Sequence, residues 1–121
     1  MTDDRRRCGA AGEDLAAEFL RARGHVVVAR NYRCARGEID LVTRDGATLV
    51  FCEVRTRRGR GAGDALESVT PAKRRRILRV AAVYLAQRRA PPGPLRFDVV
   101  AIEMRGGGVR IEHVPDAFGA D

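Results

Sequence analysis

Apolar residues recur along this chain with two periods, one typical of helices and one typical of strands. Between Ala10 and Arg23 they return every three or four positions, which predicts a helix that stops at Gly24. A second helical repeat follows Thr70-Pro71, a pair typical of an N-cap and the first helical position. The sequence Pro-Pro-Gly-Pro at 91–94 ends this repeat. The chain is therefore expected to contain two helices.

Shorter apolar runs rich in β-branched residues predict strands between and after these helices. They span residues 25–29, 38–44, 47–55, 96–104 and 109–114. The resulting order, α-β-β-β-α-β-β, predicts an α/β fold with a mixed central β-sheet flanked by helices. At 121 residues the chain has the length of a single domain. We expect that domain at 9–115, with a flexible N-terminal tail at 1–8 and a C-terminal tail at 116–121.

The runs at 38–44 and 47–55 flank Asp45-Gly46, which is a strong signal of a β-hairpin with a two-residue turn. Such a turn pairs Arg44 with Ala47. Two further pairs follow from it: Glu38 opposite Glu53, and Asp40 opposite Phe51. One face of the hairpin is then apolar and carries Ile39, Leu41, Val50, Cys52 and Val54. The other face gathers charged side chains at the end far from the turn: Glu38, Asp40, Glu53 and Arg55.

Basic residues outnumber acidic ones by 23 to 16, which gives a formal net charge of +7. The excess lies between Val54 and Phe97, where twelve basic and two acidic residues give +10, and the rest of the chain has a net charge of −3. This asymmetry favours a surface that faces a polyanion such as nucleic acid. A solvated helix face is the alternative. Under the first interpretation the residues expected to contact nucleic acid are Arg57, Arg58, Arg60, Lys73 and Arg74.

The cysteines and the apolar runs exclude several other classes of protein. Cys8, Cys34 and Cys52 are odd in number, form no Cys-x-x-Cys pair and have only two histidines beside them, which argues against a zinc site or a disulfide framework. No apolar run approaches the roughly 18 residues of a membrane helix, and the N-terminus lacks the apolar stretch of a signal peptide. We therefore expect a cytoplasmic protein that does not enter a membrane.

The charged end of the hairpin face needs a partner, because burying an unpaired carboxylate is costly. Glu38, Asp40 and Glu53 offer oxygen ligands there, which suit Mg²⁺. Such an ion can polarise a phosphate and lower the pKa of an attacking water. Alternatively these are exposed charges at a sheet edge, with Arg55 paired to one of the glutamates. Spacing alone leaves both interpretations open.

Four short motifs occur in order along the chain: Gly-Glu-x-x-Ala at 12–16, Gly-Glu-Ile-Asp-Leu at 37–41, Phe-Cys-Glu-Val-Arg at 51–55 and Arg-Phe-Asp-Val-Val at 96–100. With them the chain resembles, over roughly residues 9–104, the YraN-like family of uncharacterised bacterial proteins. That family is similar to archaeal Holliday-junction resolvases and to other PD-(D/E)xK nucleases. The resemblance implies a restriction-endonuclease-like fold for this chain.

The resemblance also implies roles for four residues. Asp40 and Glu53 would bind a metal ion, Mg²⁺ or Mn²⁺, and Glu13 would be the additional carboxylate of the resolvase-like branch. The chain departs from the nuclease pattern at its last position, where E-x-K becomes Glu53-Val54-Arg55. An arginine stays protonated, so Arg55 can steady a scissile phosphate but cannot take a proton.

Three functions remain open at this stage. The first is a metal-dependent endonuclease on structured DNA, with Glu13, Asp40, Glu53 and Arg55 as its catalytic set; a homodimer would suit a junction, which has two strands to cut. The second is a non-catalytic nucleic-acid-binding module on the same fold, because binding survives the change to Arg55 more easily than hydrolysis does. The third is a protein-interaction domain whose basic surface meets an acidic partner.

Overall fold

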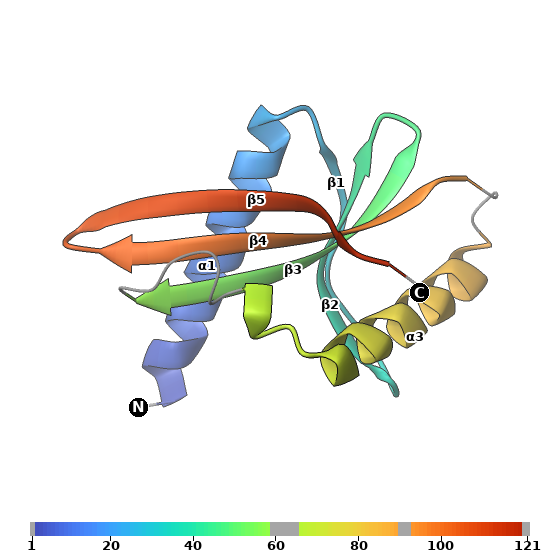
Figure 1. The fold of residues 1–121 in the computed structure, drawn as a ribbon, viewed down its shortest axis with the longest axis horizontal. Helices are drawn as coiled ribbons and strands as arrows, with labels where there is room; N and C mark the ends of the chain where they lie inside the picture. The colour runs from blue at the N-terminus through green and yellow to red at the C-terminus, as the bar shows by residue number, and fades with distance from the viewer. Residues whose placement is uncertain (1, 59–65, 90–92, 120–121) are drawn as a thin grey trace.

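The computed structural model describes residues 2–58, 66–89 and 93–119, and the side chains of residues 11–57, 66–89, 93–104 and 106–119. Within these residues the chain forms two long helices and one five-stranded sheet (Figure 1). The elements are α1 (Thr2–Ala22), β1 (Val26–Cys34), β2 (Gly37–Asp45), β3 (Thr48–Arg58), α3 (Pro71–Arg88), β4 (Leu95–Arg105) and β5 (Gly108–Phe118). The predicted α/β fold and its order, α-β-β-β-α-β-β, are confirmed.

The sheet is mixed, and its strands follow one another in chain order, β1-β2-β3-β4-β5. All neighbouring strands are antiparallel except β3 and β4, which are parallel. A parallel pair needs a crossover connection, and α3 lies in that connection. Figure 1 shows α1 behind the long strands β3 to β5 and α3 beside β2. No helix in the described ranges is long and apolar enough to cross a membrane.

The two helices cover opposite faces of the sheet, because alternate residues of each central strand belong to different clusters. Leu41 and Val50 pack with Leu20 of α1. Their neighbours Val42 and Phe51 pack instead with α3. The α3 residues buried in that second cluster are Ile77, Val80, Ala81 and Tyr84.

The ends of α3 follow the sequence signals. Thr70 is the N-cap, and its side chain accepts a hydrogen bond from the backbone N–H of Lys73 at 3.3 Å. The helix stops at Arg88, and Arg89 adopts a left-handed conformation with φ 47°. Gly37 at the start of β2 has φ +141°, and a Cβ there would lie 3.2 Å from the Arg76 side chain. A glycine at this position therefore allows α3 to approach β2 closely.

The predicted register of the β2–β3 hairpin is wrong by two residues. Asp45 pairs with Thr48, so the turn consists of Gly46-Ala47 rather than Asp45-Gly46. Gly46 has φ +61°, which suits the first central position of a type II′ turn. In consequence Val42, not Asp40, lies opposite Phe51. Because both turns contain two residues, the shift preserves which side chains of the two strands share a face near the turn.

The predicted partner of Glu38 changes with the same shift. The observed pairs place Leu41 opposite Cys52. Continuing this ladder would set Asp40, rather than Glu38, opposite Glu53. The prediction that Glu38 faces Glu53 is therefore wrong, and the correction brings the two expected metal ligands, Asp40 and Glu53, closer together than the sequence implied.

Ile39 is a second correction, since the sequence placed it on the same face as Leu41. Ile39 packs in the α3 cluster together with Val42, whereas Leu41 lies in the α1 cluster. The alternation of β2 is therefore interrupted at Asp40. On the neighbouring strand β1, Asn31 has a left-handed φ of 52° at the same level. Both strands are irregular where Asp40 sits.

The elements are longer than the apolar patterns predict. Helical backbone begins at Thr2 rather than Ala10. β1 continues to Cys34 through residues expected to form a loop, and β5 extends to Phe118. The polar ends of these elements gain backbone hydrogen bonds but add little to the apolar period, which is why the pattern misses them.

Candidate functional site

Asp40 and Glu53 meet where β2 separates from β3. The backbone ladder between the strands runs from Asp45 to Leu41. Beyond Leu41 a side chain replaces the backbone as the hydrogen-bond acceptor: Asp40 Oδ2 accepts from the backbone N–H of Val54 at 2.8 Å. Glu53 precedes Val54 on β3, and its carboxyl group forms a hydrogen bond with that of Asp40. The break in the ladder therefore brings two carboxyl groups together.

This pair holds a proton that an isolated carboxylate would lose at neutral pH. The pKa of Asp40 is raised to about 8, most of all by desolvation on burial and further by the hydrogen bond and negative charge of Glu53. The N–H of Val54 and the charge of Arg55 oppose the rise but do not cancel it. Two carboxyl groups that share a proton form a site where a cation could take the proton's place.

Glu13 approaches the pair from α1. Desolvation on burial and the charge of Asp40 raise the pKa of Glu13, against the opposing effects of Arg30 and Asn31. With its amide nitrogen turned toward α1, Asn31 donates to Glu13 Oε1 at 2.7 Å. Among the side chains that the structure describes, however, no three His, Cys, Asp or Glu groups gather closely enough to hold a metal ion. Glu13 is thus a neighbour of the pair formed by Asp40 and Glu53.

Arg55 lies on the same strand as Glu53, two residues further on. Its Nη2 donates to the backbone carbonyl of Ser68 at 3.2 Å. The Nε atoms of Arg55 and Arg57 are buried and have no hydrogen-bond partner within the described part of the chain. A buried N–H without a partner is costly. Each of these two guanidinium groups therefore has one donor that the described residues leave unsatisfied.

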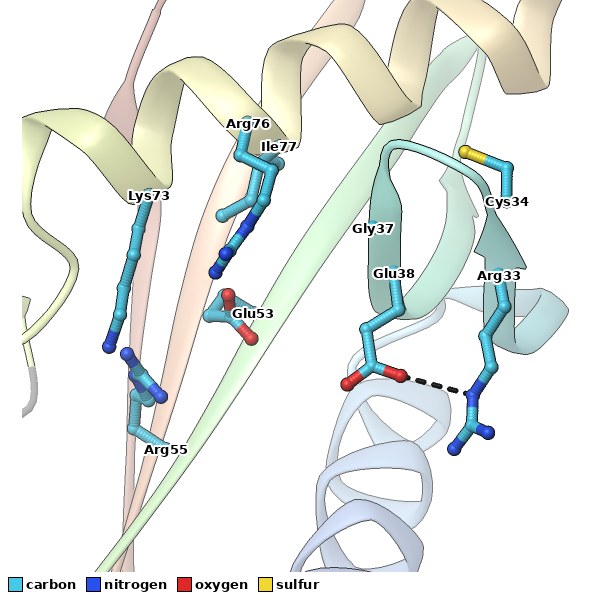
Figure 2. A pocket seen from close by; sticks show the side chains of 9 residues that line it. All are labelled: Arg33, Cys34, Gly37, Glu38, Glu53, Arg55, Lys73, Arg76 and Ile77. Carbon is cyan, nitrogen blue, oxygen red and sulfur yellow. Dashed lines mark ion pairs between the residues drawn. The ribbon is translucent and has the colours of Figure 1, made fainter.

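A pocket of about 470 Å³ opens beside Glu53 (Figure 2). The turn between β1 and β2, strand β3 and helix α3 form its walls. Figure 2 shows Glu53 beneath Arg76, the Lys73 side chain extending from α3 toward Arg55, and Glu38 on the opposite side. There Glu38 accepts from Arg33 Nε at 3.1 Å. The lining residues are Arg33, Cys34, Gly37, Glu38, Glu53, Arg55, Lys73, Arg76 and Ile77. Four cations and two carboxylates make this pocket net positive.

The structure places some of the residues predicted to bind nucleic acid near the pocket and others away from it. Lys73 lines the pocket, and Arg57 lies on the Arg55 side of β3. Arg74 points elsewhere: its Nε donates to the carbonyl of Val69 at 2.9 Å, and its guanidinium lies 5.7 Å from the centre of the Phe118 ring. The side chain of Arg58 and all of Arg60 lie outside the described residues.

Two pocket cations, Arg33 and Arg76, are not among the five residues that the sequence predicted to contact nucleic acid. Arg76 follows Lys73 by three positions on α3, a spacing that places both on one side of a helix. That spacing was a usable signal. For Arg33 the sequence offered no such signal, because its position in the pocket depends on β1 continuing through residues that were expected to form a loop.

Another carboxylate of the sheet, Asp98, is fully buried on the α1 side of β4. Arg96 donates to both of its oxygens at 2.9 and 3.0 Å, and Arg96 Nη1 also reaches Asp45 at 3.0 Å. His113 Nε2 lies 2.7 Å from Asp98 Oδ2, and the backbone N–H of Asp116 donates to Oδ1 at 3.0 Å. Desolvation acts to raise the pKa of Asp98, but these hydrogen bonds outweigh it and lower that pKa to about 2.

Residues 12–102, which include Asp40, Glu53 and Asp98, match the model of a protein family described as "Uncharacterised protein family UPF0102". The chain belongs to UPF0102. It is 52% identical over 116 residues to a UPF0102 protein of Symbiobacterium thermophilum, covering 95% of this chain and 98% of that one. It is also 52% identical over 120 residues to one of Roseiflexus castenholzii, covering 97% of each chain. A UPF0102 protein of Ralstonia pickettii is 53% identical over 117 residues, 93% of this chain and 90% of that one.

The UPF0102 match confirms the family resemblance drawn from the four motifs. It covers residues 12–22 of α1, then β1, the whole β2–β3 hairpin, α3 and most of β4. The carboxyl pair and the pocket beside it therefore lie within the part of the chain that defines the family match.

Proposed function

We propose that this protein is a metal-dependent endonuclease that acts on structured DNA. The observation that carries the proposal is the pair formed by Asp40 and Glu53, which shares a proton at one edge of a net positive pocket. Carboxylates forced together in this way recur at functional sites, because the fold keeps an unfavourable contact that a ligand relieves. The resemblance of the chain to PD-(D/E)xK nucleases supports the same reading.

The residues fit a divalent metal ion that keeps part of its water shell. Mg²⁺ is commonly bound through one or two carboxylates, with water and phosphate oxygens as its other ligands. Asp40 and Glu53 would supply the two carboxylates, and Glu13 lies next to Asp40 from the other side. When bound, such an ion would polarise the phosphate and make a water a stronger nucleophile.

The protein's own side chains would hold the DNA backbone beside this pair. Arg33, Arg55 and Arg76 line the pocket and can each donate to phosphate oxygens. An arginine does not act as a proton acceptor, so Arg55 would steady the phosphate. Contacts of this kind recognise the backbone and not the base sequence, which suits a substrate defined by its shape.

Calorimetry with Mn²⁺ at pH 6, 7 and 8 tests the metal site directly. The shared proton must leave when the ion binds, so we expect affinity to rise by about tenfold per pH unit below pH 8. Asp40→Asn and Glu53→Gln should abolish binding, whereas Glu18→Gln, an exposed carboxylate on α1, should not. Equal Mn²⁺ binding by Asp40→Asn would overturn the metal site.

Cleavage of a four-way DNA junction and of a linear duplex tests the activity. We expect junction cleavage with Mg²⁺ or Mn²⁺, none with EDTA, and none with Asp40→Asn or Glu53→Gln. The proposal fails if the wild type binds the metal but cuts neither DNA, or if the two variants cut as fast as the wild type.

A second candidate, a non-catalytic nucleic-acid-binding module, is favoured by the arginine at position 55. It predicts that the junction binds without cleavage and that affinity falls with salt, since neutralised phosphates release counterions. Replacing Arg57 would then reduce the salt dependence, and Arg55→Lys would change little. If Arg55→Lys produces cleavage that the wild type lacks, the fold is a nuclease whose activity the arginine has removed.

A further inference from the structure

Lys73 is the only lysine in the chain, and it lies in the pocket. It stands in the first turn of α3, where its backbone N–H is fixed by the Thr70 cap. From there the side chain reaches toward Arg55, with Glu53 close by (Figure 2). A lysine therefore reaches the pocket beside Glu53 from a helix and not from strand β3.

Lys73 and Arg55 line the same pocket, and like charges that face one space repel each other. Within the described residues the Lys73 ammonium forms no ion pair that would offset this repulsion. The partner of Glu38 is Arg33, and the Arg55 guanidinium donates to Ser68. An anion bound between Lys73 and Arg55 would remove the repulsion and use both charges.

The two cations differ in what they can do for a phosphate. Arg55 is planar and is held on one side by the Ser68 carbonyl, so its orientation is restricted. Lys73 ends in a compact ammonium with three donors that can turn toward a phosphate oxygen and a water at the same time. The nuclease pattern expects such an ammonium two residues after Glu53, and this chain has an arginine there.

We propose that Lys73 is a catalytic residue: its ammonium, delivered from α3, contacts the scissile phosphate and the attacking water, in the role that the lysine of E-x-K would have. Arg55 then serves to hold the phosphate. The inference rests on the proposed nuclease function. In the step itself a water oxygen bonds to phosphorus and the bond from phosphorus to the leaving sugar oxygen breaks. The water loses one proton to solvent and the leaving oxygen gains one, so water is the only co-reactant.

Single-turnover cleavage of the junction at saturating protein and Mn²⁺ separates chemistry from binding. We expect Lys73→Ala to lower the cleavage rate by about 100-fold or more, with the dissociation constant of the junction raised by less than about tenfold. Lys73→Arg should recover the affinity but little of the rate. Arg75→Ala is the matched control: it removes an equal charge from an exposed position two residues along α3 and should change affinity only.

A double variant sharpens the test. If an ammonium is what the pocket needs, Arg55→Lys should restore part of the rate to Lys73→Ala, because it returns a lysine to the strand position. Cleavage by Lys73→Ala at the wild-type rate, in conditions where Asp40→Asn does not cut, would overturn the role of Lys73 and leave the proposed function intact. A wild type that cuts under no metal condition would overturn both. Unchanged melting temperatures of the variants would exclude misfolding as the cause of a slower rate.

Discussion

Asp40, which is partly buried, and Asp98, which is fully buried, are both carboxylates of the central sheet, and their surroundings are opposite. Asp98 has two oxygens that together accept from Arg96, His113 and the backbone of Asp116. Asp40 has one backbone donor and a second carboxyl group as its neighbour. The pKa of Asp98 falls to about 2, whereas that of Asp40 rises to about 8.

This difference separates a carboxylate that holds the fold together from one that is kept ready for a ligand. Asp98 joins β4 to β5, and through Arg96 it also reaches the end of β2. Hydrogen bonds from the protein itself stabilise its negative charge. The charge of Asp40 is suppressed, because the protein supplies too few donors to stabilise it. A metal ion would supply what is missing, and this is why we assign function to the Asp40 region.

The largest expected effect is on stability at Asp98. Asp98→Asn keeps the shape of the side chain but leaves the partly buried Arg96 with the half-exposed Asp45 as its remaining countercharge. Breaking a buried ion pair in this way costs about 3–5 kcal/mol, and urea unfolding at pH 7 measures it. Asp40→Asn should show no such loss. If Asp98→Asn loses less than about 1 kcal/mol, the two sites do not differ as described.

The same comparison predicts how acid acts on the protein. The folded pKa of Asp98 lies below its ordinary value of 3.8, so its contribution to stability is present above pH 3.8 and is lost as pH falls toward 2. The difference in the free energy of unfolding between the wild type and Asp98→Asn should therefore become smaller below pH 4. A deficit that stayed constant from pH 6 to pH 3 would contradict the ion-pair explanation.

The second expected effect is that the contribution of Asp40 to stability depends on pH in the opposite sense to that of Asp98. Its folded pKa is raised above 3.8, so the stability it contributes is complete below pH 3.8 and is lost as pH rises toward 8. The free energy of unfolding should fall by up to about 1.4 kcal/mol per pH unit through this range, and Asp40→Asn should remove that part of the slope. At pH 8 the variant should therefore be the more stable protein.

Urea unfolding of wild type and Asp40→Asn at pH 5, 6, 7 and 8 gives the difference directly. Comparing the two proteins cancels the titration of all other groups. The prediction is wrong if the difference in the free energy of unfolding does not change with pH. Adding Mn²⁺ should reverse the order at pH 8, because the ion stabilises only the protein that binds it.

Much of the Asp40 region could be predicted from the sequence. The charged end of the hairpin was expected because the side-chain period of a strand is two. The register was wrong by two residues, an even number, so the side chains near the turn stayed on the predicted faces. The predictions that failed were the cross-strand partner of Glu38 and, separately, the face of Ile39. The face of Ile39 is set by irregular backbone at Asp40 and at Asn31, whose left-handed φ of 52° no apolar pattern records.

The Asp98 network could not be predicted in this way. Its members come from β2, β4 and β5, and Asp45 and Arg96 are 51 positions apart in the chain. Local periodicity carries no information about which strands become neighbours. The same limit applies to Lys73: its place in the first turn of α3 was predictable, but its position near Glu53 depends on how α3 packs across the sheet.

A third prediction concerns the backbone that sets α3 against the Asp40 region. Gly37 has φ +141°, and a Cβ would lie 3.2 Å from Cδ and 3.3 Å from Cγ of Arg76. Gly37→Ala should therefore destabilise the fold by about 1–3 kcal/mol and weaken Mn²⁺ binding by moving α3. Gly119→Ala is the control, since nothing lies within 4 Å of its Cβ. If Gly37→Ala matches Gly119→Ala in urea unfolding, close packing of α3 is not required there.

The smallest expected effect tests whether burial, and not merely the presence of a charged partner, divides the two regions. Glu38 pairs with Arg33 at 3.1 Å, but both side chains are more than half exposed. An exposed pair contributes about 0–1 kcal/mol, so Glu38→Gln should change the free energy of unfolding by less than about 0.5 kcal/mol at any pH from 5 to 8. A loss near that of Asp98→Asn would mean that a hydrated ion pair stabilises this protein as strongly as a buried one. The opposite pKa shifts of Asp40 and Asp98 could then no longer be attributed to the donors that each carboxylate meets inside the fold.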